Sequence, residues 1–352
     1  SSDVCSSDLC NNGFFTRKGV PFAQFFLLFL WRVFFLHSIP LFIPSSSHPL
    51  MSHFVRSCAA FAVATFCVSF PVSAQSGPIF AWGDDTYQQI SESPLHTDFT
   101  HLSGGRHFAL ALRENGSIVA WGDDSFGQVA DTPNGTGFYE LAAGDRHGLA
   151  LKTDGSLRSW GYNDQSVVSD TPLGIGFAQV ASSAGYSLAR LASGSLVIWG
   201  NTLGHLDVDL PSETDFIQIS AGPRYALALH ADGRIEAWGD DLGMGVIADA
   251  PLGSGFVTIS AGESHALAIR SDGSLVAWGR DTFGQISNMP SAGFFTDIAT
   301  GQAHSVALDR DGLVHTWGKD NYGQVSGVST VSDVIYISSG LNFSLSIVEI
   351  GR

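Results

Sequence analysis

A tryptophan-glycine pair recurs at nearly constant spacing through most of this chain. The tryptophans of the ladder are separated by 39 residues at every step but one, where the gap is 40: Trp82, Trp121, Trp160, Trp199, Trp238, Trp278 and Trp317. A fixed period of this length is typical of repeat architectures in which each unit is one supersecondary piece. A residue that recurs in every unit is therefore expected to stabilise the unit, whatever chemistry its type suggests.

The residues before the ladder are expected to lie outside the folded repeats. Residues 1–50 read as a translated non-native leader, because residues 3–9 look like a sequencing adapter and no methionine precedes Met51. Residues 51–74 have the pattern of a secretory signal peptide, with a positive charge at Arg56, an apolar stretch and a small-residue cleavage site at Ala74. All four cysteines precede this site, so the mature chain, residues 75–352, would contain neither a disulfide nor a cysteine metal site.

The charge of the chain excludes some partners. The formal net charge is −16 at pH 7, which repels nucleic-acid phosphates and anionic membranes at long range. We therefore expect no nucleic-acid partner and no membrane insertion. A basic protein partner remains compatible with this charge.

One repeat, residues 256–279, shows how each unit is built. Three short runs alternate between apolar and polar residues, which is the pattern of β-strands. Asp272-Gly273 between the second and third runs predicts a two-residue hairpin turn with positive φ at both positions. A proline follows each of the first six Trp-Gly pairs, from Pro94 to Pro290, and argues against a long fourth strand. Each unit is predicted to be a three-stranded antiparallel sheet, and no helical periodicity is present.

The two ends of the repeat region predict how the units close. Residues 77–83 supply only a third strand, whereas residues 334–340 and 343–347 supply only a first and a second strand. Joined, these ends complete a seventh unit and remove the exposed edges that a linear stack would leave. The prediction is an all-β, seven-bladed β-propeller with mostly three-stranded blades, closed by a split blade from the N- and C-terminal ends.

The repeat also carries a family resemblance. The run Ala-Gly-x-x-His-x-Leu-Ala-Leu, followed by Asp-Gly-Ser-Leu-x-Ala-Trp-Gly-x-Asp-x-x-Gly-Gln, resembles the repeat of the regulator of chromosome condensation family across residues 77–348. The resemblance implies a seven-bladed propeller. The eponymous eukaryotic protein is a guanine-nucleotide exchange factor that binds nucleosomes, but the repeats here are shorter and no basic tail is present. The chain is more similar to secreted bacterial members, including a β-lactamase-inhibitory protein, which implies a secreted or periplasmic location.

Several residues that suggest catalysis or metal binding recur with the repeat. His147, His265 and His304 occupy a position that other units fill with phenylalanine or tyrosine, so we expect packing with a satisfied nitrogen. No metal-ligand spacing of the His-Glu-x-x-His kind is present. Aspartates after Trp-Gly, such as Asp85 and Asp320, fit turn chemistry, with cation binding or a carboxylate pair as alternatives. We expect no catalytic residue, no metal site and no cofactor.

Candidate binding residues are the positions at which the repeats differ. In an antiparallel meander, the turn between strands one and two opens on the same face as the turn after strand three. The variable residues of these turns give the candidate site: Arg106, His107, Arg146, Tyr162, Arg224 and Glu263. Arginine and aromatic residues are frequent anchors of protein interfaces. The turn aromatics Tyr87, Phe126, Phe283 and Tyr322 could instead pack the outer turn, and the opposite face, with Arg113, Lys152, His230 and Arg270, is expected to be ordinary solvated surface.

These features predict an exported, non-enzymatic and monomeric propeller that binds a protein or peptide through one face. Inhibition of a secreted enzyme is one version of this function. Two alternatives stay open from the sequence. One is an enzyme acting on a polysaccharide or another substrate at the central pocket, and the other is a structural cell-surface protein.

Overall fold

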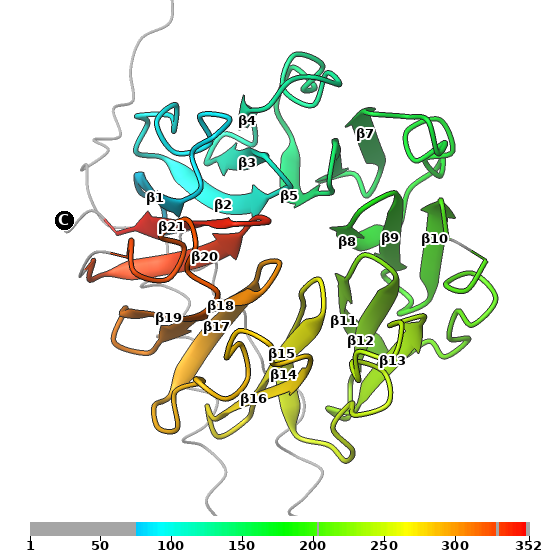
Figure 1. Ribbon diagram of the computed structural model, residues 1–352. Helices are drawn as coiled ribbons and strands as arrows, with labels where there is room; N and C mark the ends of the chain where they lie inside the picture. The colour runs from blue at the N-terminus through cyan, green and yellow to red at the C-terminus, as the bar shows by residue number, and fades with distance from the viewer. Residues whose placement is uncertain (1–74, 203, 329–330, 350–352) are drawn as a thin grey trace, which may run out of the picture. The chain divides into compact units, whose positions relative to one another are not determined.

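Short alternating strands joined by glycine-containing turns fold into seven small sheets around a central axis (Figure 1). The computed structural model describes residues 75–202, 204–328 and 331–349. The predicted leader (1–50) and signal peptide (51–74) therefore lie outside the described residues. The all-β, seven-bladed propeller predicted from the sequence is confirmed. Within the described ranges, no helix is long and apolar enough to cross a membrane.

Six blades take their strands in chain order, and the seventh combines both ends of the repeat region. The strands are, for blade 1, β2 (Phe99–Gly104), β3 (Phe108–Arg113) and β4 (Ile118–Gly122); for blade 2, β5 (Phe138–Ala143), β6 (His147–Lys152) and β7 (Leu157–Gly161); for blade 3, β8 (Phe177–Ser182), β9 (Tyr186–Leu191) and β10 (Leu196–Gly200); for blade 4, β11 (Phe216–Ala221), β12 (Tyr225–His230) and β13 (Ile235–Gly239); for blade 5, β14 (Phe256–Ala261), β15 (His265–Arg270) and β16 (Leu275–Gly279); for blade 6, β17 (Phe295–Thr300), β18 (His304–Asp309) and β19 (Val314–Gly318); and for blade 7, β20 (Val334–Ser339), β21 (Phe343–Val348) and β1 (Ile79–Gly83).

The order of strands places the core between adjacent blades. The first strand of each blade lies next to the first strands of its two neighbours, around the axis, and the third strand lies outermost (Figure 1). The middle strand is almost entirely buried, because its leucine and alanine side chains pack against the blades on both sides. Each hydrophobic cluster combines residues of two neighbouring blades, as in the packing of Tyr225 and Leu227 against Phe256 and Trp278. A single blade could not bury these surfaces alone.

Blade 7 is closed by pairing between the two ends of the repeat region. Strand β1 pairs antiparallel with β21, which in turn pairs with β20. Trp82 lies opposite Ser344 in this pairing, as Trp121 lies opposite Ala109 within the continuous blade 1. The split blade therefore has the same register as the others, as the sequence predicts.

The tryptophan ladder forms a continuous series of contacts between blades. Each indole is buried and donates its Nε1–H to a backbone carbonyl in the turn of the preceding blade, such as Trp121 to Gln89 at 2.9 Å. Six of these bonds span 32 residues, and the seventh joins Trp82 to Gln324 at 3.1 Å. The last bond crosses from the N-terminal strand to blade 6, so the ladder is an unbroken ring.

The hairpin turn between the second and third strands differs from the prediction. Gly273 has φ of 80°, whereas Asp272 is not among the residues with positive φ. The N–H of Gly273 donates to the carbonyl of Arg270, and Arg270 pairs with Ser274, which makes a three-residue loop. The carboxylate of Asp272 accepts the N–H of Ser274 at 3.0 Å. The prediction of a two-residue turn was wrong, because the bond from Ser274 to the Asp272 carboxylate and one left-handed glycine are sufficient to reverse the chain.

The ring position at the start of each middle strand forms a second set of contacts between blades. Each ring is 1% exposed or less: Phe108, His147, Tyr186, Tyr225, His265, His304 and Phe343. His265 Nε2 hydrogen-bonds with Ser305 Oγ in the next blade at 2.9 Å, and His304 pairs with Ser344 in the same way. Burial lowers the pKa of His265 to about 4. The predicted packing role with a satisfied nitrogen agrees with this geometry.

The residue type at the ring position depends on which residue the next blade places beside it. Histidine occurs where the next blade supplies serine directly after its own ring residue, as in His147 with Ser187 at 3.0 Å. Phenylalanine or tyrosine occurs where that residue is alanine or glycine, as in Phe343 followed by Ala109 of blade 1. A polar ring nitrogen is thus buried where a hydroxyl is available to pair with it.

Side chains of the innermost strands also link neighbouring blades. The N–H of Ile219 donates to the side chain of Gln179 at 2.9 Å, and the N–H of Val180 donates to Glu140 at 3.5 Å. These bonds satisfy strand N–H groups that face another blade rather than a strand of the same sheet. Burial raises the pKa of Glu140, and also that of Asp297 on β17, to about 7.

These two carboxyl groups make stability depend on pH. A folded-state pKa above the ordinary values of 4.5 and 3.8 stabilises the fold at low pH, and this contribution is lost as pH rises through about 7. We expect Glu140→Gln, which copies Gln179, and Asp297→Asn each to stabilise the protein by about 1–3 kcal/mol at pH 8. Urea unfolding at acidic and alkaline pH measures this. Exposed Glu92→Gln is the control, and an equal pH response of all three variants would contradict the assignment.

The histidine-serine pairing also predicts a compensating double variant. Ser305→Ala leaves His265 Nε2 buried without a partner, which should cost about 1–3 kcal/mol. Adding His265→Phe recreates the Phe343–Ala109 combination of blades 7 and 1, so most of the lost stability should return. Urea unfolding of both single variants and the double variant gives the coupling. Additive losses in the double variant would show that the pair has no energetic role.

Candidate functional site

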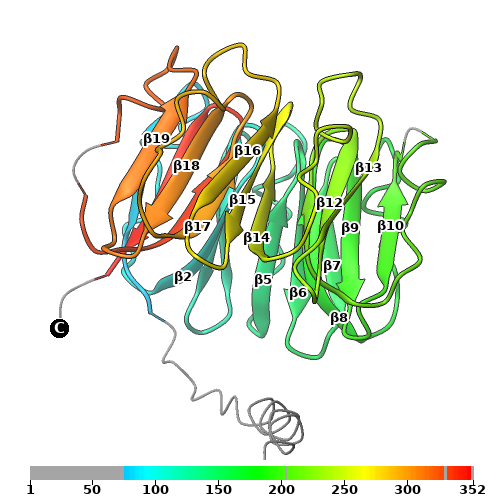
Figure 2. The ribbon, with the colours of Figure 1, turned by 90° about the horizontal axis from the view of Figure 1, so that it is seen from below.

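Two sets of turns lie together on one face of the propeller, here called the turn face. After each Trp-Gly pair, the next backbone N–H donates to the turn between strands one and two of the same blade, as in Tyr162 to the carbonyl of Arg146 at 3.0 Å. Asp240 donates to Arg224 at the same distance. Both turns therefore open on the same side, as the sequence predicts, and Figure 2 shows them on the upper edge of the propeller.

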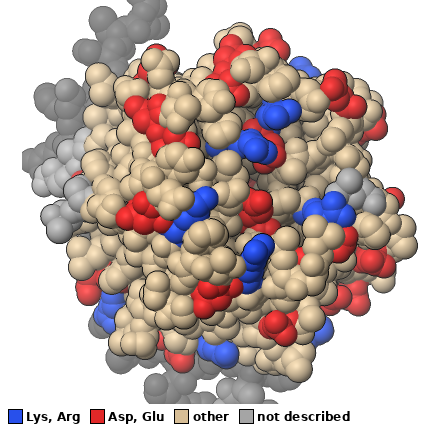
Figure 3. Space-filling view, viewed as in Figure 1, with Lys and Arg blue, Asp and Glu red and all other residues tan. Residues whose placement is uncertain are grey.

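A funnel opens at the centre of the turn face. Its volume is about 510 Å³, and all seven blades contribute to its wall. Small residues and backbone form most of this wall, as at Ser103, Ser182 and Ser220, while Arg106 and Glu263 lie among its lining residues. Figure 3 views this face, with basic side chains around the central hollow and acidic ones between and outside them.

A second cavity beside the funnel brings four of the six candidate residues together. It has a volume of about 380 Å³ and is called the arginine pocket here; its lining residues are Arg106, Asp145, Arg146, Tyr162, Gln165, Ala184, Gly185, Asn201, Pro223 and Arg224. The arginines come from blades 1, 2 and 4. Glu263 lines the funnel rather than this pocket, and His107 lines neither cavity.

The three arginines are held in different ways. Arg106 forms an ion pair with Asp145 at 3.2 Å, and Arg224 forms one with Asp240 at 2.9 Å. Arg146 instead lies over two aromatic rings, 4.8 Å from the centre of Phe126 and 5.6 Å from that of Tyr162. These contacts hold all three guanidinium groups while leaving part of each accessible.

His107 packs against the neighbouring turn rather than opening into the pocket. Its ring lies 4.4 Å from that of Tyr87, between ring centres. Burial, together with the positive charge of Arg106, lowers the pKa of His107. A neutral imidazole stacked on tyrosine fits packing or hydrogen bonding better than charge recognition.

The turn aromatics are half-exposed. The exposed fraction is 41% for Tyr87, 38% for Phe126, 48% for Phe283 and 50% for Tyr322. Phe126 lies beneath Arg146, and Lys319 lies 5.5 Å from the ring centre of Phe283. These side chains therefore pack on the turn with one side and present the other side to solvent, which is the usual setting of an interface anchor.

The aspartates after Trp-Gly bind their own turns. Asp320 Oδ1 accepts the N–H groups of Val325 and Ser326 at 2.8 and 3.0 Å, and Asp85 accepts the equivalent pair. Burial acts to raise the pKa of Asp320, but these backbone bonds outweigh it and lower the value overall. In the part of the chain that the structure describes, no group of three metal-ligating side chains is arranged to hold an ion. The geometry supports the turn interpretation.

Sequence reasoning missed the half-buried carboxyl groups on the inner strands. Glu140 and Asp297 belong to a series of equivalent positions at the repeat spacing: His101, Glu140, Gln179, Gln218, Thr258, Asp297 and Tyr336. This run of polar residues within otherwise apolar strands was the available signal. A pKa near 7 would suit a general acid. Neither carboxyl group lines the funnel or the arginine pocket.

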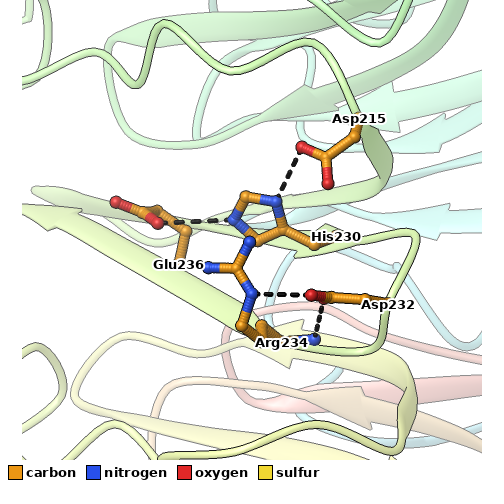
Figure 4. A network of polar contacts seen from close by, with 5 residues as sticks. All are labelled: Asp215, His230, Asp232, Arg234 and Glu236. Atoms are coloured by element: carbon orange, nitrogen blue, oxygen red, sulfur yellow. Dashed lines mark hydrogen bonds and ion pairs between the residues drawn. The ribbon is translucent and has the colours of Figure 1, made fainter.

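The opposite face differs from the expectation of ordinary solvated surface at one position. The side chain of His230 is fully buried, with Nδ1 2.8 Å from Asp215 and Nε2 3.4 Å from Glu236 (Figure 4). Arg113 of blade 1 occupies the equivalent place and pairs with Asp98. His230 is therefore a buried link between the hairpin and the loop before β11, because a carboxylate 15 residues upstream reaches it.

Comparison with known proteins agrees with the repeat pattern. The profile of the Regulator of chromosome condensation (RCC1) repeat matches residues 99–128, 139–166, 256–285 and 295–324. Similar solved structures include Prp20p from Saccharomyces cerevisiae, described with its binding to Gsp1p and histones. It has a TM-score of 0.64 and 20% identity, covering 80% of this chain and 93% of that one.

Two further structures show the same fold. Human WBSCR16 has a TM-score of 0.64 and 14% identity, covering 79% of this chain and all of that one. The ectodomain of the Physcomitrella patens receptor kinase CR4 has a TM-score of 0.58 and 21% identity, covering 70% of each chain. A search of curated protein sequences gave no match.

Proposed function

We propose that this chain, a seven-bladed propeller of regulator of chromosome condensation repeats, is an exported, non-catalytic protein that binds a protein or peptide partner through its turn face. The proposal rests first on the arginine pocket, where guanidinium groups of three blades converge beside Tyr162. Arginine and tyrosine are over-represented among the residues that dominate binding energy at protein interfaces.

The aromatic side chains around this pocket support the same function. Phe126 and Tyr162 form an edge-to-face pair with ring centres 4.8 Å apart, and Arg146 lies over both rings. A rigid aromatic and arginine cluster on a turn loses little conformational freedom when it is covered by a partner. Export would follow from the signal peptide expected at residues 51–74.

The relatives make protein binding a reasonable role for the fold. Prp20p, which is similar in fold, is described as binding Gsp1p and histones. At 20% identity this likeness extends only to the fold, because unrelated activities are carried by the same scaffold. The choice of partner therefore depends on the turn residues of this chain.

An enzyme acting on a polysaccharide is the second candidate, and one observation favours it. Glu140 and Asp297 are carboxyl groups whose pKa is raised by burial to about 7, near the axis of the propeller. However, of the two carboxylates that line the funnel, Asp145 and Glu263, Asp145 is paired with Arg106, and a glycosidase requires two carboxylates facing the substrate. The turn face therefore suits a binding protein better.

The binding proposal predicts a face-specific loss of capture. Phe126→Ala removes the ring beneath Arg146 and should weaken capture of the native partner by at least ~10-fold. Phe294→Ala is the matched control, because Phe294 is also exposed and lies beneath Arg310, on the opposite face. The measurement is co-purification of the full chain with proteins of its native culture medium, followed by binding of the captured protein to both variants.

Two results would contradict the proposal. One is equal loss of capture with Phe126→Ala and Phe294→Ala. The other is binding to a glycan array when no protein is captured.

A further inference from the structure

The arginine pocket is a positively charged site in an acidic protein. Three arginines line it together with the carboxylate of Asp145, and Asp240 pairs with Arg224 from outside the lining, so the arginines exceed these carboxylates by one, whereas the whole chain has a formal net charge of −16. The local excess of guanidinium groups favours an anionic ligand group. Because the pocket is small, that group must be presented singly or on a narrow segment of a partner.

The arginines keep N–H donors available for such a group. Arg106 donates to Asp145 through Nη1, and Arg224 donates to Asp240 through Nη2, so each uses one terminal nitrogen and one carboxylate oxygen. Among the described residues, Arg146 forms no salt bridge. The planar fork of a guanidinium matches the two oxygens of a carboxylate, which makes charge-assisted bidentate bonds possible.

The key guanidinium is also positioned in advance. Arg146 lies over Phe126 and Tyr162, and the Tyr162 hydroxyl donates to Asp164 at 2.6 Å. A donor that is already fixed loses less freedom when it binds, so more of the interaction appears as affinity. The arrangement therefore serves recognition rather than only the packing of the turn.

The surroundings of the pocket select how the anion is presented. Asp124 and Asp164 are exposed, in the same turns as Phe126 and Tyr162, and like charges in an interface oppose the approach of a partner. A polyanion such as nucleic acid would meet these carboxylates, whereas a single acidic residue among neutral or basic ones would not. We propose that the arginine pocket receives one Asp or Glu side chain of the partner, flanked by neutral or basic residues.

This inference rests on the proposed function, and a peptide selection can test the two separately. The full chain is used to select from a random peptide library, and bound peptides are sequenced. Peptides that bind the turn face should share one acidic residue, and its replacement by Gln or Asn should weaken binding by ~10-fold or more. Arg146→Gln and Arg224→Gln should weaken the same peptides to a similar extent, without changing the unfolding temperature.

Arg310→Gln is the matched control, because Arg310 lies over Phe294 on the opposite face, 5.4 Å from the ring centre. It should leave peptide affinity unchanged. Sodium phosphate should displace the peptides no better than sodium chloride at equal ionic strength, because a side-chain carboxylate is recognised together with its neighbours. Displacement by phosphate alone would overturn the inference in favour of a free-anion site.

The remaining outcomes separate the inference from the function. Peptides that lose affinity with Phe126→Ala but carry no acidic residue would refute the inference and leave protein binding by the turn face intact. Acidic peptides whose affinity is unchanged by both arginine variants would also refute the inference and leave protein binding by the turn face intact. A selection that gives no peptide sensitive to Phe126→Ala would contradict both.

Discussion

The hydrogen bond from each ladder tryptophan to a carbonyl of the preceding blade is the contact on which the propeller depends. It joins a buried indole on the outer strand of one blade to the turn of another, so it fixes both the packing of the blades and the position of the turn. Since a buried indole N–H without an acceptor is costly, every blade must present a carbonyl at the same place. This requirement explains why the spacing of the ladder hardly varies.

The same requirement separates structural positions from variable ones. Turn aspartates such as Asp320 accept the N–H groups that shape the turn, and ring histidines such as His265 pair with serines of the next blade. Residues fixed in this way are not available for recognition. Positions that the ladder does not constrain, such as Arg146 and Arg224, can differ between blades, and they meet in one pocket of the turn face.

Much of the fold could be predicted from the sequence, because the tryptophan period and the split at Gly77 and Val348 are visible without any contact information. The prediction of a two-residue turn at Asp272 was wrong, because the side-chain bond to Ser274 stabilises a three-residue loop instead. The burial of His230 was missed because its partner Asp215 lies 15 residues upstream, in the loop before β11, and the pair meets only in the folded blade.

The sequence could predict which face carries the candidate site, but not which residues of that face share a cavity. The sequence places Arg106, His107, Arg146, Tyr162, Arg224 and Glu263 on turns of one side. Which of them share a cavity depends on how the turns of neighbouring blades surround the space between them. In the folded propeller, Glu263 lies in the funnel and His107 lies against Tyr87. The raised pKa values of the half-buried Glu140 and Asp297 could not be predicted from the sequence either, because their environment is made by the inner strands of other blades.

Hydrogen exchange of the seven ladder indole N–H groups, followed by NMR, tests the central claim most directly. If the ends of the repeat region complete an equivalent seventh blade, the indole of Trp82 is bonded to Gln324 as firmly as Trp121 is bonded to Gln89. The predicted result is that Trp82 exchanges as slowly as the other six, through opening of the whole propeller. Rapid exchange at Trp82, with slow exchange at the rest, would show that the ring is not closed by this contact.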